Sequence, residues 1–215
     1  MSVIRVTIAT VVTGLVAVTL AACGSATTPG GGGAAPSSSS APAPPTTVPP
    51  ATGPVTGVGT VIEVPEKGPE LCLGPVRESF PPQCEGVPLA RWDWAKAGIQ
   101  EESPAGTGTA VRWGTYAVTG TFDGLTMTVT TSVSLALYDT VAPPSPRPMA
   151  PPELTADEWA DVETGVRLLP GLLTSLREGD TGPVLVDVVH DDGTLQDWAD
   201  AAFGVGAVRV TSMLR

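Results

Sequence analysis

Residues 24–56 contain no charged side chain and consist almost entirely of Gly, Ala, Pro, Ser and Thr, with uninterrupted runs at Gly30–Gly33 and Ser37–Ser40. So little apolar surface cannot offset the conformational entropy that ordering this stretch would remove. We therefore predict a disordered stalk over residues 23–56, which confines the folded part to residues 57–215. The stalk would span between roughly 30 Å as a flexible coil and ~100 Å when fully extended.

The N-terminal end of the chain has the pattern of an export signal. Arg5 supplies a short positive region, and Val6–Leu20 is an uncharged, apolar run shorter than the roughly 20 residues that a membrane span needs. The sequence Leu20-Ala21-Ala22-Cys23 follows and resembles the lipobox of bacterial lipoproteins. The resemblance implies that residues 1–22 are a signal peptide and that lipidated Cys23 anchors the chain to the outer face of the cell membrane. A plain signal peptide cut after an Ala-x-Ala pattern, or an uncleaved anchor, is the alternative.

All charges of the exported chain lie beyond the stalk. The whole sequence has 11 Lys and Arg residues against 22 Asp and Glu residues, a net charge of −11. Removal of residues 1–22 takes away only Arg5, which leaves 10 basic residues and a net charge of −12. Such an acidic protein is a poor ligand for nucleic acid and for anionic lipid surfaces. The expected partners are the membrane, through the lipid anchor, and an envelope protein or glycan.

The folded part is predicted to have an α+β fold, with a β-rich N-terminal half at residues 57–140. Residues 57–64 alternate in the manner of a strand. One face of that strand consists of Val58, Thr60, Ile62 and Val64. The proline-crowded residues 141–153 cannot form a helix or a central strand, so we predict that they connect the two halves.

A hairpin is the clearest local prediction in the β-rich half. Asp123-Gly124 lies between two runs in which apolar residues alternate with threonine, over residues 116–130. A two-residue Asp-Gly turn between such runs is a strong hairpin signal. In this register Phe122 lies opposite Leu125, and the threonines line the other face.

The C-terminal half, residues 154–215, is predicted to be a small α/β unit. Thr155 and Glu158 have the spacing of a capping box at the start of a helix that Pro170 ends. The later elements are expected to be a short helix, a strand, a helix capped by Thr194 and a final strand. They occupy residues 172–178, 184–189, 195–203 and 207–214. The two strands are expected to pair in parallel.

The remaining two cysteines, Cys72 and Cys84, form an even pair in an oxidising compartment, which predicts a structural disulfide. A redox or metal-binding pair is the alternative. Eleven intervening residues do not fit a redox Cys-x-x-Cys motif, and a zinc site would need further thiols. The stretch Leu71–Val76, Pro81-Pro82-Gln83-Cys84 and Trp92-Asp93-Trp94 is similar to a family of exported actinobacterial proteins of unknown function. The resemblance implies the same compartment and the disulfide, and it brings no activity.

Few residues point to catalysis. His190 is the only histidine, and the sequence has no Gly-x-Ser-x-Gly, Gly-x-x-x-x-Gly-Lys or His-Glu-x-x-His motif. The best cluster is Asp187, His190, Asp191 and Asp192 at the end of a predicted strand, where it could bind a ligand or a divalent cation. The same residues also fit an ordinary turn that leads into a helix. We expect no cofactor.

Trp92 and Trp94 are predicted to share one face of a strand around Asp93. Exposed, they would form a stacking platform for sugar rings or an interface; buried, they belong to the core. The sequence therefore favours a membrane-anchored, non-catalytic binding or scaffolding domain of the cell envelope. The alternatives are a hydrolase or metal-dependent enzyme that uses the cluster around His190, and a glycan-binding module built on the two tryptophans.

Overall fold

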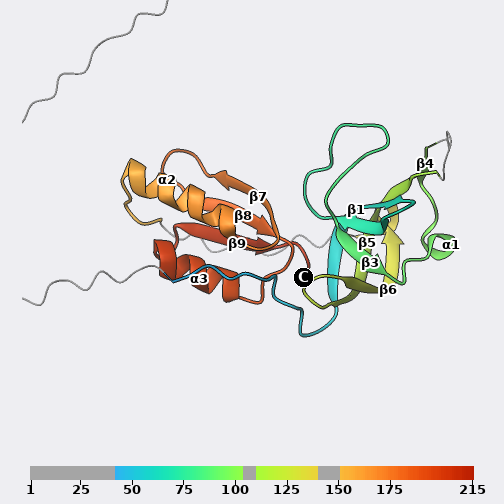
Figure 1. Cartoon of the computed structure of the whole chain (residues 1–215), viewed down its shortest axis with the longest axis horizontal. Helices are drawn as coiled ribbons and strands as arrows, with labels where there is room; N and C mark the ends of the chain where they lie inside the picture. The colour runs from blue at the N-terminus through green and yellow to red at the C-terminus, as the bar shows by residue number, and fades with distance from the viewer. Residues whose placement is uncertain (1–41, 104–109, 140–150) are drawn as a thin grey trace, which may run out of the picture. The chain divides into compact units, whose positions relative to one another are not determined.

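The computed structural model describes residues 42–103, 110–139 and 151–215. The predicted signal peptide, Cys23 and the stalk up to residue 41 lie outside the described residues, as does the Pro-rich connection up to residue 150. Within the described ranges the fold is mixed α+β, with nine strands in two sheets and three α-helices (Figure 1). The predicted fold class is therefore confirmed.

The first sheet contains six strands. They are β1 Val55–Val64, β2 Gly68–Cys72, β3 Val87–Ala90, β4 Glu101–Glu102, β5 Arg112–Phe122 and β6 Met127–Ser134. The short helix α1, Trp94–Ala97, follows β3, and a 3₁₀ turn at Leu135–Leu137 follows β6.

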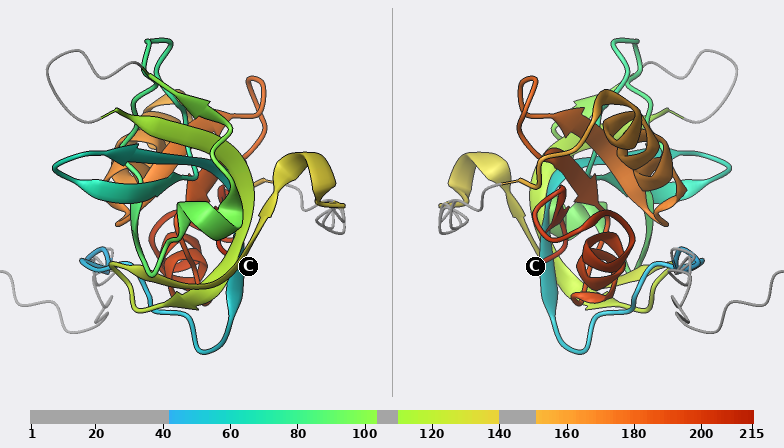
Figure 2. Two further views of the ribbon diagram at one scale, coloured as in Figure 1. Left: turned by 90° about the vertical axis from the view of Figure 1, so that its right-hand side faces the viewer. Right: turned by 90° about the vertical axis from the view of Figure 1, so that its left-hand side faces the viewer.

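Five of these strands form a closed ring in the order β1-β2-β3-β6-β5, because β1 also pairs with β5. All neighbours are antiparallel except β3 and β6. This is a Greek-key barrel with the strand order of the OB fold. The strong curvature of β5, lime green in Figure 2, is what a sheet needs in order to close on itself.

The interior of the barrel is filled from alternate positions of its strands. Val55 and Val61 of β1 and Val118 and Phe122 of β5 belong to one buried cluster. Ile62 lies on the opposite face of β1 and packs with Trp113 in a separate, smaller cluster outside the barrel. The strand prediction is thus confirmed, but the face that the sequence singled out, with Ile62, is not the one that lines the main core.

The predicted hairpin exists, but its strands pair two residues away from the predicted register. Phe122 pairs with Met127 instead of Leu125, so the turn holds four residues. Gly124 has positive φ and Asp123 does not, which excludes the two-residue turn that needs positive φ at both positions. Instead, the Asp123 carboxylate accepts hydrogen bonds from the backbone N–H groups of Leu125, at 2.9 Å, and Thr126, at 2.7 Å. Because strand faces repeat every two residues, this shift leaves the apolar face unchanged.

The second sheet belongs to the C-terminal half and has the order β7-β8-β9. Its elements are α2 Ala156–Gly165, a 3₁₀ turn at Val166–Leu168, β7 Leu172–Arg177, β8 Val184–Val188, α3 Thr194–Phe203 and β9 Val208–Ser212. Both helices cover one face of this sheet, where Val184, Val186 and Val188 pack with Trp159 and Leu195 (Figure 2, right). The parallel pairing of β8 and β9 is confirmed.

Two local predictions in this half have different outcomes. Thr155 is the N-cap of α2, and its capping box with Glu158 is complete. The helix predicted at 172–178 is wrong, because this segment is β7 and pairs antiparallel with β8. The leucine spacing fits a helix, but the adjacent strand β8 offers a ladder of backbone hydrogen bonds that outweighs a weak local preference.

Residues 42–54, here named the strap, were predicted to be part of the disordered stalk, and this prediction is wrong. The strap has no helix or strand, but it runs beside α3 to the start of β1 (blue in Figure 1). The indole N–H of Trp198 donates to the Pro42 carbonyl at 3.0 Å, and the backbone N–H of Ala51 donates to Phe122 O at 2.9 Å. Val48 packs against the barrel core. The folded part therefore includes the strap, and β1 begins at Val55.

The barrel and the α/β half also share contacts beyond the strap. Leu214, near the C-terminus, is buried in the barrel cluster, together with the partly buried Leu173 and Val189. Thr56 and Arg215 exchange two backbone hydrogen bonds, of 2.6 and 3.1 Å. The two halves thus keep separate cores that meet along the last residues of the chain.

Candidate functional site

The histidine that the sequence singled out has a structural role. His190 is only 7% exposed, and its Nδ1 donates to the carbonyl oxygen of Pro49 in the strap at 2.9 Å. Its ring packs against Phe122, with 5.9 Å between the ring centroids. His190 lines neither of the two cavities described below.

The three carboxylates near His190 are committed to local hydrogen bonds. Asp187 accepts from the hydroxyl of Thr174 at 2.7 Å. Asp191 accepts from the backbone N–H groups of Gly193 and Leu195, and thereby caps α3 where Gly193, and not Thr194, is the N-cap residue. The structure does not assemble these carboxylates with His190 into one site.

Asp192 binds the residue that was predicted to cap α3. The hydroxyl of Thr194, at 2.6 Å, and its backbone N–H, at 3.1 Å, both donate to the Asp192 carboxylate and hold its pKa below the ordinary value. Across the described ranges, no group of three or more His, Cys, Asp or Glu residues is placed to hold a metal ion. The turn that leads into a helix is therefore the interpretation that fits this segment.

The two tryptophans are not on a strand. Asp93 is the N-cap of α1, so Trp92 precedes this helix and Trp94 begins it, and the predicted strand around Asp93 is wrong. The two indoles pack edge to face at 5.2 Å, and both lie against the ring of Tyr116 in the barrel core. Both are half-buried, so they do not form an open stacking platform.

An ion-pair network fixes the position of Trp94. The indole N–H of Trp94 donates to the carboxylate of Glu63, and the guanidinium of Arg112 lies 3.9 Å from the same carboxylate. Arg112 also donates to Glu102 at 3.1 Å. The helix α1 is thereby tied to the ends of three strands, which is a packing role.

The disulfide between Cys72 and Cys84 is present, with 6.0 Å between the Cα atoms. It closes residues 73–83, here named the disulfide loop. Both cysteines pack with Ile62 and Trp113 on the outer face of the barrel. The predicted disulfide is confirmed.

A cavity of about 430 Å³ lies beside the disulfide loop and is the candidate binding site. Its apolar lining consists of Ile62, Val64, Pro81, Pro82, Cys84 and Val111. The charged residues around it are Glu66, Glu70, Glu85, Lys67 and Arg77. Sequence reasoning did not find this site, because its walls come from β1, β2, the disulfide loop and Val111, just before β5. The sequence signal that could have indicated this site is the number of prolines between the two cysteines that close the loop.

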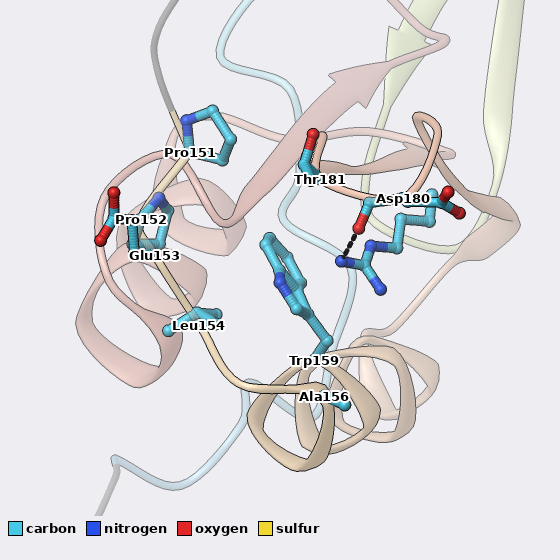
Figure 3. Close-up of a pocket in the computed structure, with 9 residues that line it drawn as sticks. Pro151, Pro152, Glu153, Leu154, Ala156, Trp159, Asp180 and Thr181 are labelled. Atoms are coloured by element: carbon cyan, nitrogen blue, oxygen red, sulfur yellow. Dashed lines mark hydrogen bonds between the residues drawn. The ribbon is translucent and has the colours of Figure 1, made fainter.

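A second cavity, of about 570 Å³, lies in the α/β half (Figure 3). Pro151 and Pro152 stand on one side, Asp180 and Thr181 on the other, and the Trp159 indole lies between them. The indole is buried, and the Arg177 guanidinium covers it at 4.2 Å from the ring centroid. Arg177 also donates to the carbonyl oxygen of Asp180. Since the aromatic face is already occupied, this cavity lacks a free stacking surface.

Comparisons of the chain with protein-family models, with curated proteins and with solved structures found no match. Within the described ranges, no helix combines the length and the apolar character that crossing a membrane requires.

Proposed function

We propose that this chain is a membrane-anchored lipoprotein outside the cytoplasm, and that its folded part is a non-catalytic binding or scaffolding module of the cell envelope. The attachment is proposed from the lipobox residues Leu20–Cys23. Two acyl chains on one cysteine give durable anchoring, whereas one chain gives only marginal binding. The likeness to exported actinobacterial proteins supports the same compartment.

The observation that carries the proposed location is the Cys72–Cys84 disulfide. Disulfides form and persist in oxidising compartments and are rare in the cytosol. The third cysteine, Cys23, lies at the end of the export signal, which agrees with a separate, lipid-bearing role.

The proposed binding role is supported by how the polar residues are used. His190 is hydrogen-bonded to the strap, Asp191 caps α3, and Asp187 and Asp192 accept hydrogen bonds from Thr174 and Thr194. The cavity beside the disulfide loop, in contrast, combines an apolar lining with charged residues at a solvent-exposed edge. Such a lining is typical of a binding site.

Fractionation of bacteria that export lipoproteins tests the anchor. We expect the full chain to stay with the membranes in high salt and to be released by detergent. The Cys23→Ala variant should appear in the soluble extracytoplasmic fraction, and Ser25→Ala, a change two residues away, should behave like the wild type. Salt-resistant membrane attachment of a Cys23→Ala chain that lacks residues 1–22 would overturn the proposal.

A further inference from the structure

The disulfide loop is held in one conformation by more than its covalent closure. The backbone N–H of Arg77 donates to Gln83 O at 2.8 Å, and that of Ser79 donates to Arg77 O at 2.8 Å. The Ser79 hydroxyl donates to Pro81 O at 2.9 Å. Prolines in the loop restrict its backbone further. A loop that is ordered in advance loses little entropy when it binds a partner.

This loop presents an aromatic side chain to solvent. Phe80 is 73% exposed, although a Phe side chain gains free energy by leaving water. Its ring and the Trp113 indole pack edge to face, with 5.5 Å between centroids and an interplanar angle of 85°. The ring is therefore positioned by the barrel while most of its surface stays free. Aromatic side chains that become buried when an interface forms often dominate its binding energy.

The charges at this surface are predominantly acidic. Four glutamates, Glu66, Glu70, Glu78 and Glu85, lie on the disulfide loop or around the adjacent cavity, against the two cations Lys67 and Arg77. In the part of the chain that the structure describes, none of these six side chains forms an ion pair with another residue. The whole chain is also acidic, with a net charge of −11.

We propose that the disulfide loop and the 430 Å³ cavity beside it form a docking surface for a basic protein segment that carries apolar side chains. One apolar side chain of the partner fills the cavity, a further apolar group packs against Phe80 next to it, and the Lys or Arg residues of the partner pair with the surrounding glutamates. This inference rests on the proposed function as a binding module. A second copy of the chain is disfavoured as the partner, because its surface carries the same excess of negative charge.

Selection from a random peptide library tests this surface directly. We would immobilise the full chain and select binders from a phage-displayed library of random peptides. The selected peptides should have a net positive charge and at least one large apolar residue. Their affinity should fall about tenfold or more in the Phe80→Ala variant, which is the loss expected for an interface anchor. Because the charged groups are exposed, the affinity should also fall as salt is raised.

Matched variants separate this surface from the rest of the molecule. Leu125→Ala removes another exposed apolar side chain, 80% exposed in the hairpin turn, and should leave the affinity unchanged. Glu66→Lys should weaken binding, whereas Asp157→Lys, an exposed change on α2, should not. Circular dichroism and the melting temperature show whether each variant is folded.

Three results would overturn the inference. The first is that the selected peptides bind Phe80→Ala as tightly as the wild type, and the second is that they carry a net negative charge. The third is that no peptide binds the immobilised chain more strongly than it binds the support without protein. Peptides that bind elsewhere on the molecule would leave the proposed binding role standing. The fate of the Cys23→Ala variant in fractionation is independent of all three results, so a failure of the membrane anchor is recognised separately.

Discussion

His190 and Pro49, which are 141 positions apart in the chain, are joined by a 2.9 Å hydrogen bond from the imidazole Nδ1 to the carbonyl oxygen. Both residues are buried. The bond ties the strap to the loop between β8 and α3, at a point where Phe122 of the barrel also packs. The only histidine of the chain therefore holds its two halves and its N-terminal strap together.

Replacing this histidine should destabilise the fold. In His190→Phe the aromatic ring is kept, but the buried carbonyl of Pro49 loses its donor, which costs about 1–3 kcal/mol of the free energy of unfolding. Urea denaturation of the full chain measures the difference. Thr47→Ala, an exposed change in the same strap, should alter stability by less than about 0.5 kcal/mol. Equal stability of His190→Phe and the wild type would show that the bond is unimportant.

Removing the strap should have a larger effect. A fragment of residues 55–215 loses the hydrogen bonds of the strap to Trp198, His190 and Phe122, and also the packing of Val48. Compared with residues 42–215, we expect its melting temperature to fall by about 5–10 °C, since 1 kcal/mol corresponds to roughly 2–4 °C at this size. Calorimetry on both fragments makes the comparison. Identical melting curves would show that residues 42–54 add nothing to the stability of the folded part.

The hairpin turn should show a defined dependence on pH. Backbone N–H groups of Thr126 and Leu125 hold the pKa of Asp123 below its ordinary value of 3.8. Its ionised form therefore contributes stability that is present above pH 3.8 and is lost as the pH falls through the lower pKa of the folded state. In Asp123→Asn this contribution is absent. The stability difference between wild type and Asp123→Asn, measured by denaturation across pH 2–7, should shrink towards acid pH; a constant difference would contradict the account.

The disulfide should be both stabilising and fully formed. The double variant Cys72→Ser/Cys84→Ser loses a cross-link that is worth about 3 kcal/mol for a loop of this size. Chemical denaturation should show this loss, and reductant should destabilise the wild type but not the variant. By mass analysis without reductant, the wild type should lack the two hydrogens of free thiols. Detection of free Cys72 and Cys84 in the native protein would refute the disulfide.

The sequence predicts those features that depend on neighbouring residues. Thr155 and Glu158 determine the start of α2 within one turn, and the short apolar run at 184–189 favours a buried strand, which is β8. Cys72 and Cys84 could be paired because Cys23 is predicted to bear the lipid, which leaves two cysteines in the predicted folded part.

Features that depend on distant residues could not be predicted in this way. The segment that forms β7 is a strand because it pairs with β8, and the strap is ordered because Trp198 and His190 offer donors to its carbonyl groups. The hairpin register depends on how the Asp123 carboxylate meets the backbone of the turn. The candidate site could not be predicted for the same reason, since the position of Phe80 depends on its contact with Trp113, 33 residues further along the chain.

The proposed attachment of the folded module to a membrane through Cys23 can be decided by the mass of the N-terminal peptide of the chain extracted from membranes. We expect a peptide that begins at Cys23, without residues 1–22, and that carries the added mass of a diacylglyceryl group. A chain that begins at another residue, or an N-terminal peptide with unmodified Cys23, would contradict it.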